Sequence, residues 1–227
     1  MIPADVANTL NGFFDKIFVV SIPRFTERHA RVKKSLEGLQ FEIFWGQDKE
    51  LINQEEIIRS GDYAPERTQS YSRRKRNLMP GEIACSMSHR KLYDHIIRQR
   101  FSRVLVLEDD VVPLENNLIH LGSAIEELPG DWGLVYFGYL KHEEVTPKLR
   151  RKQFFYKILS TLGIFRWSTN MVKKLLPKPY SSHLSLAGFH DCTHAYAITA
   201  EAAAVLLQEQ RPLVHRADDL LSYCVLT

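Results

Sequence analysis

Three adjacent carboxylates, Glu108, Asp109 and Asp110, form the group in this sequence best suited to metal chemistry. They follow directly after an apolar run at residues 104–107. Adjacent carboxylates repel one another, so the arrangement is costly unless a cation or strong hydrogen-bond donors compensate. Hard oxygen ligands favour Mg²⁺ or Mn²⁺, and these ions bridge phosphate oxygens. The cluster predicts a divalent-metal site for a phosphate-bearing ligand; the alternative is an acidic turn that is solvated or caps the next helix.

The sequence on either side of these acids predicts alternating strands and helices. Apolar, β-branched runs predict strands at residues 16–22, 41–45, 103–107, 133–138 and 193–198. Periodic apolar positions predict helices at residues 27–39, 81–100 and 201–209, with a short helix and a loop between residues 50 and 79. Thr26 is the expected N-cap of the first helix. This order predicts an α/β fold with a mostly parallel central sheet flanked by helices, and ligands bind beyond the carboxyl ends of strands in such sheets.

Length and composition fit a single domain over residues 1–227, or one domain with an appendage. A formal charge of +3 is too small to indicate a nucleic-acid partner, which we exclude. Cys85, Cys192 and Cys224 form no CxxC pair, so neither a disulfide scaffold nor a zinc module is expected. Cys85 and His89 have the spacing of a metal pair, but no further soft ligands lie nearby in sequence, and we interpret Cys85 as a core residue.

The order of several motifs resembles glycosyltransferase family 25, the group that includes bacterial lipooligosaccharide galactosyltransferases and relatives of collagen galactosyltransferases. IFVVSI at residues 17–22, followed by Arg24 and Arg28, is similar to the family's opening strand and its arginine. GEIACSMSH at 81–89 matches its Gly-Glu-x-x-Cys-x-x-Ser-His helix, VLVLEDDVV at 104–112 its Leu-Val-Leu-Glu-Asp-Asp strand, and THAY at 193–196 a late motif. One departure is WGQD at 45–48, where family members often carry Asp-Gly.

The resemblance implies a GT-A-like nucleotide-diphospho-sugar transferase fold. It implies an inverting enzyme that moves a sugar, with galactose expected, from a UDP-sugar to a saccharide or glycolipid acceptor. The setting would be synthesis of lipopolysaccharide, lipooligosaccharide or another surface glycan. Mn²⁺ or Mg²⁺ would neutralise the leaving diphosphate, and a carboxylate would take the acceptor proton. A noncatalytic or degenerate protein of the same fold and a metal-dependent nucleotidyltransferase remain alternatives.

By the same resemblance, Asp110 is the expected metal ligand and Glu108 a second contact to the metal or the ribose. Asp109 is either a ligand or a structural carboxylate. His194 or His215 would complete the metal shell or serve a structural role. The residues expected to bind the nucleotide-sugar are Arg24, Arg28, Asp48, Ser88, His89, Glu108 and Asp109.

Late carboxylates are the candidates for the catalytic base. We expect Asp218 or Asp219 to fill this role, with Asp191 as the third candidate. The competing interpretation is that Asp218 is the N-cap of a helix that continues through residues 220–223.

A basic tract at about residues 145–190 interrupts this pattern. It contains no Asp or Glu, and apolar residues alternate with the cations Lys148, Arg150, Arg151, Lys152, Lys157, Arg166, Lys173, Lys174 and Lys178. The tract predicts an insertion that contacts an anionic membrane surface or closes over the acceptor; the alternative is a helix pair whose apolar underside packs on the domain. Residues 1–11 lack a signal-peptide pattern and no apolar run approaches the length of a membrane span, so we expect a cytoplasmic protein, peripheral on the inner face of the membrane.

Overall fold

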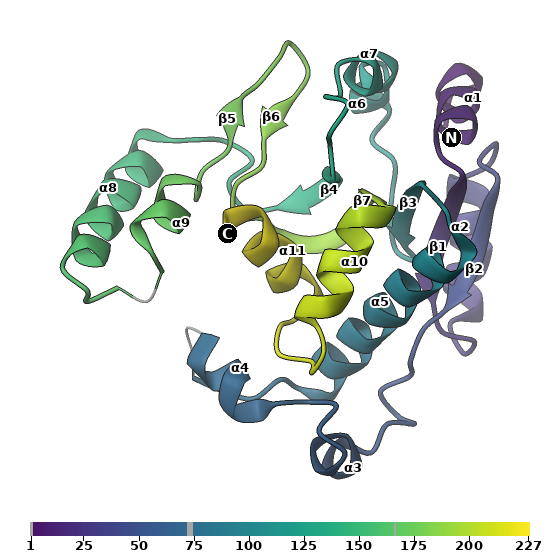
Figure 1. Cartoon of the computed structure of the whole chain (residues 1–227). Coiled ribbons are helices and arrows are strands. Elements are labelled where there is room, and N and C mark those ends of the chain that lie inside the picture. Colours follow the sequence, from purple (N-terminus) through teal and green to yellow (C-terminus); the bar gives the residue numbers. More distant parts are fainter. Residues whose placement is uncertain (1, 72–74, 166) are drawn as a thin grey trace.

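A five-stranded mixed sheet forms the centre of the molecule. The computed structural model describes residues 2–71, 75–165 and 167–227, so Arg166 of the basic tract lies outside the described residues. The strands lie in the order β2-β1-β3-β7-β4 (Figure 1). Their bounds are β1 Lys16–Ser21, β2 Phe41–Trp45, β3 Arg103–Glu108, β4 Leu134–Leu140 and β7 Asp191–Thr199. β1 pairs in parallel with β2 and β3, whereas β7 runs antiparallel to both β3 and β4. The predicted α/β class is confirmed, and the late strand is the one that runs against the others.

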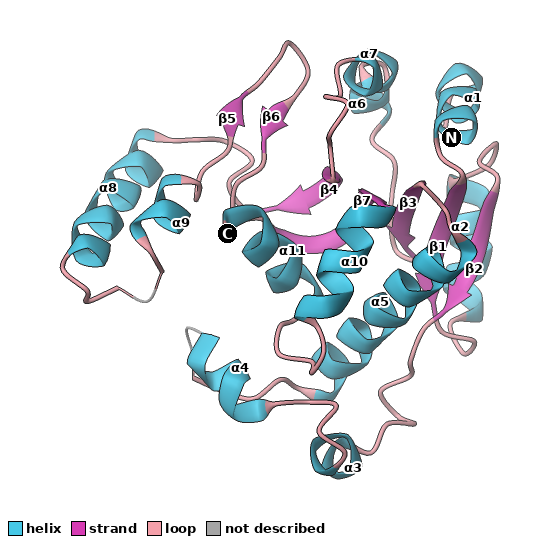
Figure 2. Cartoon of the chain, viewed as in Figure 1, coloured by secondary structure: helices cyan, strands magenta, loops and turns pink. Residues whose placement is uncertain are grey.

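Helices cover both faces of the sheet, which explains why its strands are apolar throughout. Along β1, Ile17 and Val19 contribute to the core on one face, and Phe18 contributes to the core on the other. The first core is closed by α1 Ala4–Phe13, α2 Thr26–Ser35 and α7 Leu121–Glu126, and the second by α5 Pro80–Gln99, α10 Ala200–Glu209 and α11 Ala217–Leu226. Figure 2 shows α5, α10 and α11 lying together in front of the sheet.

The long helices follow the sequence prediction, and the helix ends differ from it. Thr26 is the first residue of α2, where Phe25 holds the N-cap position and no side chain caps the helix, so the predicted Thr26 cap is wrong. The helix also ends at Ser35 instead of extending to residue 39. α1 was not predicted. The polar stretch before α5 holds two short helices, α3 Gln54–Arg59 and α4 Pro65–Tyr71, where one was expected, and α6 Glu115–Leu118 follows β3.

The basic tract lies between β4 and β7 and adds no strand to the central sheet. It forms α8 Pro147–Thr161, α9 Thr169–Lys173 and a small hairpin of β5 Lys178–Pro179 with β6 Ser185–Leu186. Figure 1 shows α8 and α9 at the left, beyond the end of β4. No residue of α8 is buried. Among the described residues, none of the helices combines the length and apolar character needed to cross a bilayer.

One edge of the sheet collects the ends of the strands that carry the predicted site. The parallel strands β1, β2 and β3 end there, at Ser21, Trp45 and Glu108. Because β7 is antiparallel, it begins at the same edge, with Asp191 paired opposite Leu140 of β4. The late residues of the THAY motif are thereby brought beside the end of β3.

Candidate functional site

Glu108, Asp110 and His194 form a compact group of potential metal ligands. One ligand atom from each lies within 4.8 Å of the others. His194 Nδ1 is 3.4 Å from Glu108 Oε2, and Thr193 Oγ1 donates a hydrogen bond to Glu108 Oε1. Burial opposes the charge on Glu108, but His194, His89 and Thr193 hold its pKa below the ordinary value. An ionised Glu108 beside Asp110 and an imidazole is a donor set that suits Mn²⁺ or Mg²⁺.

A second group, Cys85, His89 and Glu108, shares one carboxylate with the first. Cys85 is exposed and lines a cleft, so its assignment to the core is wrong. Desolvation at this concave surface, with the charges of Glu108 and Asp218, raises the pKa of the Cys85 thiol to about 12. His89 is buried, its Nδ1 lies 2.7 Å from the Tyr196 hydroxyl, and burial lowers its pKa. The first group offers two carboxylates where the second offers one, so the first is the better site for a hard divalent cation.

Asp109 holds an arginine beside the acidic group. Its carboxylate is buried and accepts hydrogen bonds from Ser21 Oγ and, at 2.7 Å, from Arg28 Nη1. The same Arg28 nitrogen is 3.4 Å from Asp110 Oδ2, and the guanidinium lies 4.6 Å from the centre of the Phe25 ring. The hydrogen bond to Asp109 raises the pKa of Arg28. This arrangement matches the interpretation of Asp109 as a structural carboxylate, which is held here by two side-chain donors.

Arg24 and Asp48 form a second ion pair at the same edge. Arg24 Nε is 2.8 Å from Asp48 Oδ2, and the Arg24 side chain remains 43% exposed. The Asp48 Oδ1 atom accepts a hydrogen bond from the backbone N–H of Glu50, which fixes the turn after β2. Asp48 therefore positions Arg24, and the guanidinium is the group of this pair that faces the open cleft.

Ser88 fixes the loop after β2 against α5. Its hydroxyl donates to the Ala84 carbonyl at 2.7 Å and accepts from the Gln47 N–H at 2.8 Å. A Cβ at Gly46 would lie 2.5 Å from Ser88 Oγ, so the close approach of the two segments requires glycine. Ser88 thus shapes the wall of the site.

These side chains converge on one cleft of about 220 Å³ beyond the ends of β1 and β3. The predicted residues that line it are Arg24, Ser88, His89, Glu108, Asp109 and Asp110. Arg28 and Asp48 do not line the cleft, but each is ion-paired to a residue that does. The structure therefore brings the predicted nucleotide-binding set together.

The three late carboxylates are engaged differently. Both Asp219 oxygens accept hydrogen bonds from Arg216, at 2.7 and 2.9 Å. The Asp218 oxygens accept from the backbone N–H groups of Cys192 and Asp219. The N-cap of α11 is Arg216, so the interpretation of Asp218 as the cap is wrong. Among the described residues, the Asp191 carboxylate contacts only Lys141 Nζ, at 3.3 and 3.4 Å.

Two of these carboxylates line a second, larger cavity. Asp191 and Asp219 belong to a space of about 620 Å³ bounded by α4, α8, α9 and α11. His215 is buried there and is not part of either ligand group, so His194 is the histidine that joins the acids. Sequence reasoning assigned no role to Thr193 or Lys141; the THAY motif was the signal for Thr193, and nothing in the sequence singled out Lys141.

Known proteins resemble this chain over most of its length. The profile of Glycosyltransferase family 25 (LPS biosynthesis protein) matches residues 14–221. A "Glycosyltransferase 25 family member" of Anopheles gambiae is 27% identical over 199 residues, which are 86% of this chain and 28% of that protein.

Two human proteins are also similar to this chain. "Inactive glycosyltransferase 25 family member 3" is 30% identical over 141 residues, covering 60% of this chain and 23% of that protein. "Procollagen galactosyltransferase 2" is 27% identical over 141 residues, covering 60% of this chain and 22% of that protein. The chain spans less than a third of the length of these three relatives. With the profile match over most of its length, the chain belongs to glycosyltransferase family 25.

Proposed function

We propose that this chain is a metal-dependent, inverting glycosyltransferase that moves a sugar from a UDP-sugar to a saccharide acceptor. The observation that carries the proposal is the grouping of Glu108, Asp110 and His194 within 4.8 Å at the cleft that Arg24 also lines. The nucleotidyltransferase alternative uses the same metal chemistry but releases pyrophosphate, so the identity of the product separates the two.

The donor diphosphate would bind at this cleft. Mn²⁺ or Mg²⁺ held by Asp110, Glu108 and His194 would neutralise negative charge on the departing UDP. The chain adds its own cations: Arg28 is held in place by Asp109, and Arg24 by Asp48. Planar guanidinium groups suit phosphate oxygens. His89 is kept neutral by burial and supports the wall behind Glu108.

The transfer needs one proton acceptor. The acceptor hydroxyl oxygen bonds to the anomeric carbon as the bond from that carbon to the UDP oxygen breaks, and UDP leaves with the electron pair. The hydroxyl proton passes to a carboxylate. We propose Asp191 for this role, because Asp218 and Asp219 each use both oxygens in strong hydrogen bonds while Asp191 has only the longer contacts to Lys141.

Galactose is the proposed donor sugar, supported by the motif order and by the human relative named as a galactosyltransferase. Lipopolysaccharide, lipooligosaccharide or another surface glycan is the proposed product, supported by the description of the family. Such acceptors are built at a membrane. We propose a cytoplasmic location, peripheral on the inner face of the membrane.

The outer face of α8 supports that location. Phe154, Ile158 and Leu162 recur at a spacing of four residues and are 66%, 42% and 64% exposed. Arg150 and Arg151 continue this face toward the start of the helix, and both are exposed. Exposed apolar side chains beside cations are typical of helices that lie on anionic lipid. The opposite face of α8 packs inward, as the alternative interpretation of the tract expects, because Tyr156 contacts the cluster of Leu175, Phe189 and Leu226.

A second candidate is a noncatalytic nucleotide-sugar-binding protein, because the human relative that is 30% identical is named as inactive. Both candidates predict binding of UDP, and only the first predicts turnover.

The first experiment is calorimetric titration of UDP with Mn²⁺ and again with EDTA. Metal-dependent binding supports the donor site, and failure to bind under both conditions rejects it. Release of UDP from UDP-galactose in the presence of acceptor glycosides then separates the enzyme from the noncatalytic protein.

A further inference from the structure

The cavity of about 620 Å³ has two aromatic walls that come from distant parts of the chain. On one side, Tyr156 and Phe165 stack with ring centres 4.6 Å apart. The Phe165 ring also contacts Trp167 edge-on, with ring centres 6.0 Å apart. Trp167 in turn stacks on Phe189, with ring centres 5.3 Å apart. This wall belongs to α8, α9 and the segments that join them to β7. The volume of the whole cavity lies within the range of small-ligand pockets, about 300–1,000 Å³.

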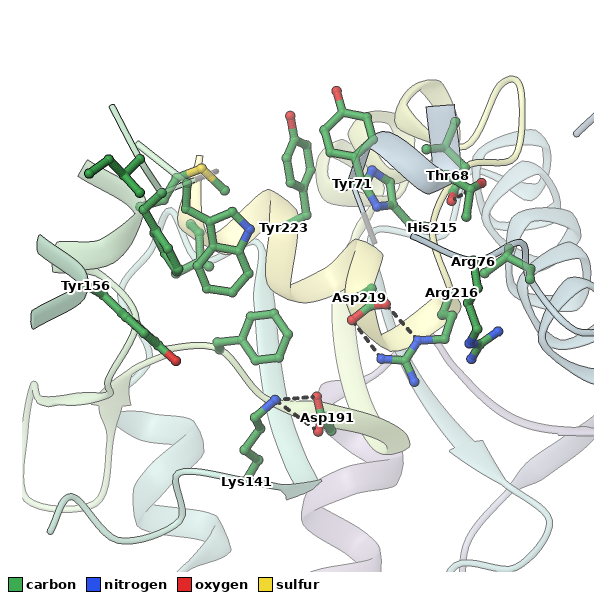
Figure 3. Close-up of a pocket in the computed structure, with 18 residues that line it drawn as sticks. Thr68, Tyr71, Arg76, Lys141, Tyr156, Asp191, His215, Arg216, Asp219 and Tyr223 are labelled. Carbon is green, nitrogen blue, oxygen red and sulfur yellow. Dashed lines mark hydrogen bonds and ion pairs between the residues drawn. The ribbon is translucent and has the colours of Figure 1, made fainter. Parts of the chain in front are cut away.

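The opposite wall is built by α4 and α11. His215 lies between two tyrosines, 4.8 Å from the Tyr71 ring centre and 4.8 Å from that of Tyr223. Figure 3 shows Tyr71, Tyr223 and His215 on one side of the cavity and Tyr156 on the other. Burial lowers the pKa of His215 to about 4, so the imidazole between the two tyrosines is uncharged at neutral pH.

Two ion pairs lie between these walls. Lys141 contacts Asp191, and Arg216 contacts Asp219 (Figure 3). Lys141 Nζ also lies 4.3 Å from the centre of the Phe189 ring. Of the lining residues that the structure describes, the remaining cation, Arg76, is paired with Glu82. The floor therefore offers hydrogen-bond donors and acceptors, and each of these lining cations is paired with a carboxylate.

Two hydrogen bonds join segments that carry these ion pairs to the neighbourhood of the donor cleft. Asp191 is two residues from Thr193, which donates to Glu108. Asp218, next to Asp219, accepts from the N–H of Cys192. Residues at the start of β7 therefore join the linings of the two cavities, with Asp191 lining the larger one and Thr193 bonded to Glu108 of the smaller one.

We propose that the larger cavity is the acceptor subsite and binds an uncharged saccharide ring between its aromatic walls, with the α8–α9 segment deciding acceptor specificity. Pyranose rings present apolar C–H faces and a rim of hydroxyls, which match ring-lined walls and a floor of paired donors and acceptors. Because each lining cation is already paired with a carboxylate, we expect a neutral sugar to bind in preference to a phosphorylated one. This inference rests on the proposed function, because it assigns the second substrate of the same reaction.

The test measures saccharide binding separately from UDP binding. Methyl β-galactoside, methyl β-glucoside and methyl β-lactoside are titrated into the full chain and followed by saturation-transfer NMR, with and without UDP and Mn²⁺. We expect at least one glycoside to bind, and Trp167→Ala and Tyr223→Ala each to weaken it at least tenfold while UDP affinity stays within twofold. Tyr180→Ala is the matched control, since Tyr180 is an exposed aromatic residue after β5, outside the cavity.

Three outcomes would overturn the assignment: no glycoside binds the wild-type chain, binding survives both aromatic variants, or a phosphorylated glycoside binds more tightly than its neutral parent. Failure of UDP to bind is a different result. It rejects the proposed function by its own titration, whereas the glycoside titration without UDP still decides whether the cavity binds saccharides.

Discussion

Thr193 of β7 donates a hydrogen bond to Glu108 at the end of β3, across a separation of 85 residues in the sequence. Thr193 is buried, and His194 approaches the other oxygen of the same carboxylate. The pair orients Glu108 toward Asp110. The hydrogen bond also joins β7, which runs antiparallel to the other strands of the sheet, to the acidic group at the end of β3.

Thr193→Val tests that orientation. The substitution keeps the shape and removes the donor, so Mn²⁺-dependent UDP affinity should fall about 10- to 100-fold, the range for groups that orient metal ligands. Calorimetry with Mn²⁺ and circular dichroism measure affinity and folding together. Thr9→Val, at a partly exposed threonine whose hydroxyl donates to the Asp5 carbonyl within α1, is the control. Wild-type affinity in the Thr193 variant would contradict the orienting role.

Asp110→Asn should abolish metal-dependent UDP binding and leave the fold intact. Asp110 is 49% exposed, so loss of its charge costs little stability, whereas a carboxamide is a weaker ligand for a hard cation. UDP titration with Mn²⁺ and with EDTA provides the measurement. Asp131→Asn, at an exposed carboxylate in the loop before β4, should behave as wild type. Unchanged metal dependence in Asp110→Asn would remove Asp110 from the ligand set.

Gly46→Ala should destabilise the protein. The new Cβ would lie 2.5 Å from Ser88 Oγ and 2.9 Å from Ser88 Cβ, so the loop after β2 must move. The expected loss in free energy of unfolding is about 1–3 kcal/mol, measured by urea denaturation. Gly12→Ala in α1, where nothing lies within 4 Å, should instead be neutral or stabilise by up to about 1 kcal/mol. Equal effects at both positions would show that the contact with Ser88 is unimportant.

The buried His215 predicts loss of stability in acid. Desolvation lowers its pKa from 6.5 to about 4, so between these values the unfolded chain binds more protons than the native state. Stability from this group is complete above about pH 6.5 and declines as the pH falls toward 4, by about 3 kcal/mol in total. His215→Phe keeps a ring between Tyr71 and Tyr223 and should flatten the profile of unfolding free energy against pH over that interval. Identical slopes in the two proteins would refute the assignment.

The outer face of α8 should bind anionic bilayers. Replacing Phe154 and Phe155, which are 66% and 56% exposed, by serine removes two large apolar side chains and should lower the partition coefficient at least tenfold. Sedimentation with vesicles of phosphatidylcholine and phosphatidylglycerol measures the coefficient. Val205→Ser, at a 52% exposed position of α10, is the matched control. If the double variant partitions as the wild type does, α8 is not the membrane contact.

The sequence by itself determined the parts of this protein that depend on local pattern. The apolar run before Glu108 predicts β3, because a strand buried on both faces must be apolar throughout. The periodic positions after Pro80 predict α5 in the same way. The order of the motifs indicates the family, and the three adjacent acids mark the candidate metal site.

Tertiary structure alone decided what those elements contact. Strand order places β7 beside β3, and only its antiparallel direction puts Thr193 and His194 next to Glu108. The same packing gives Asp218 and Asp219 their hydrogen-bond partners and leaves Asp191 the least engaged of the three. Periodicity reports which face of an element is buried, whereas pairings between residues far apart in the chain depend on how the elements pack, and a single sequence does not specify that packing by local pattern.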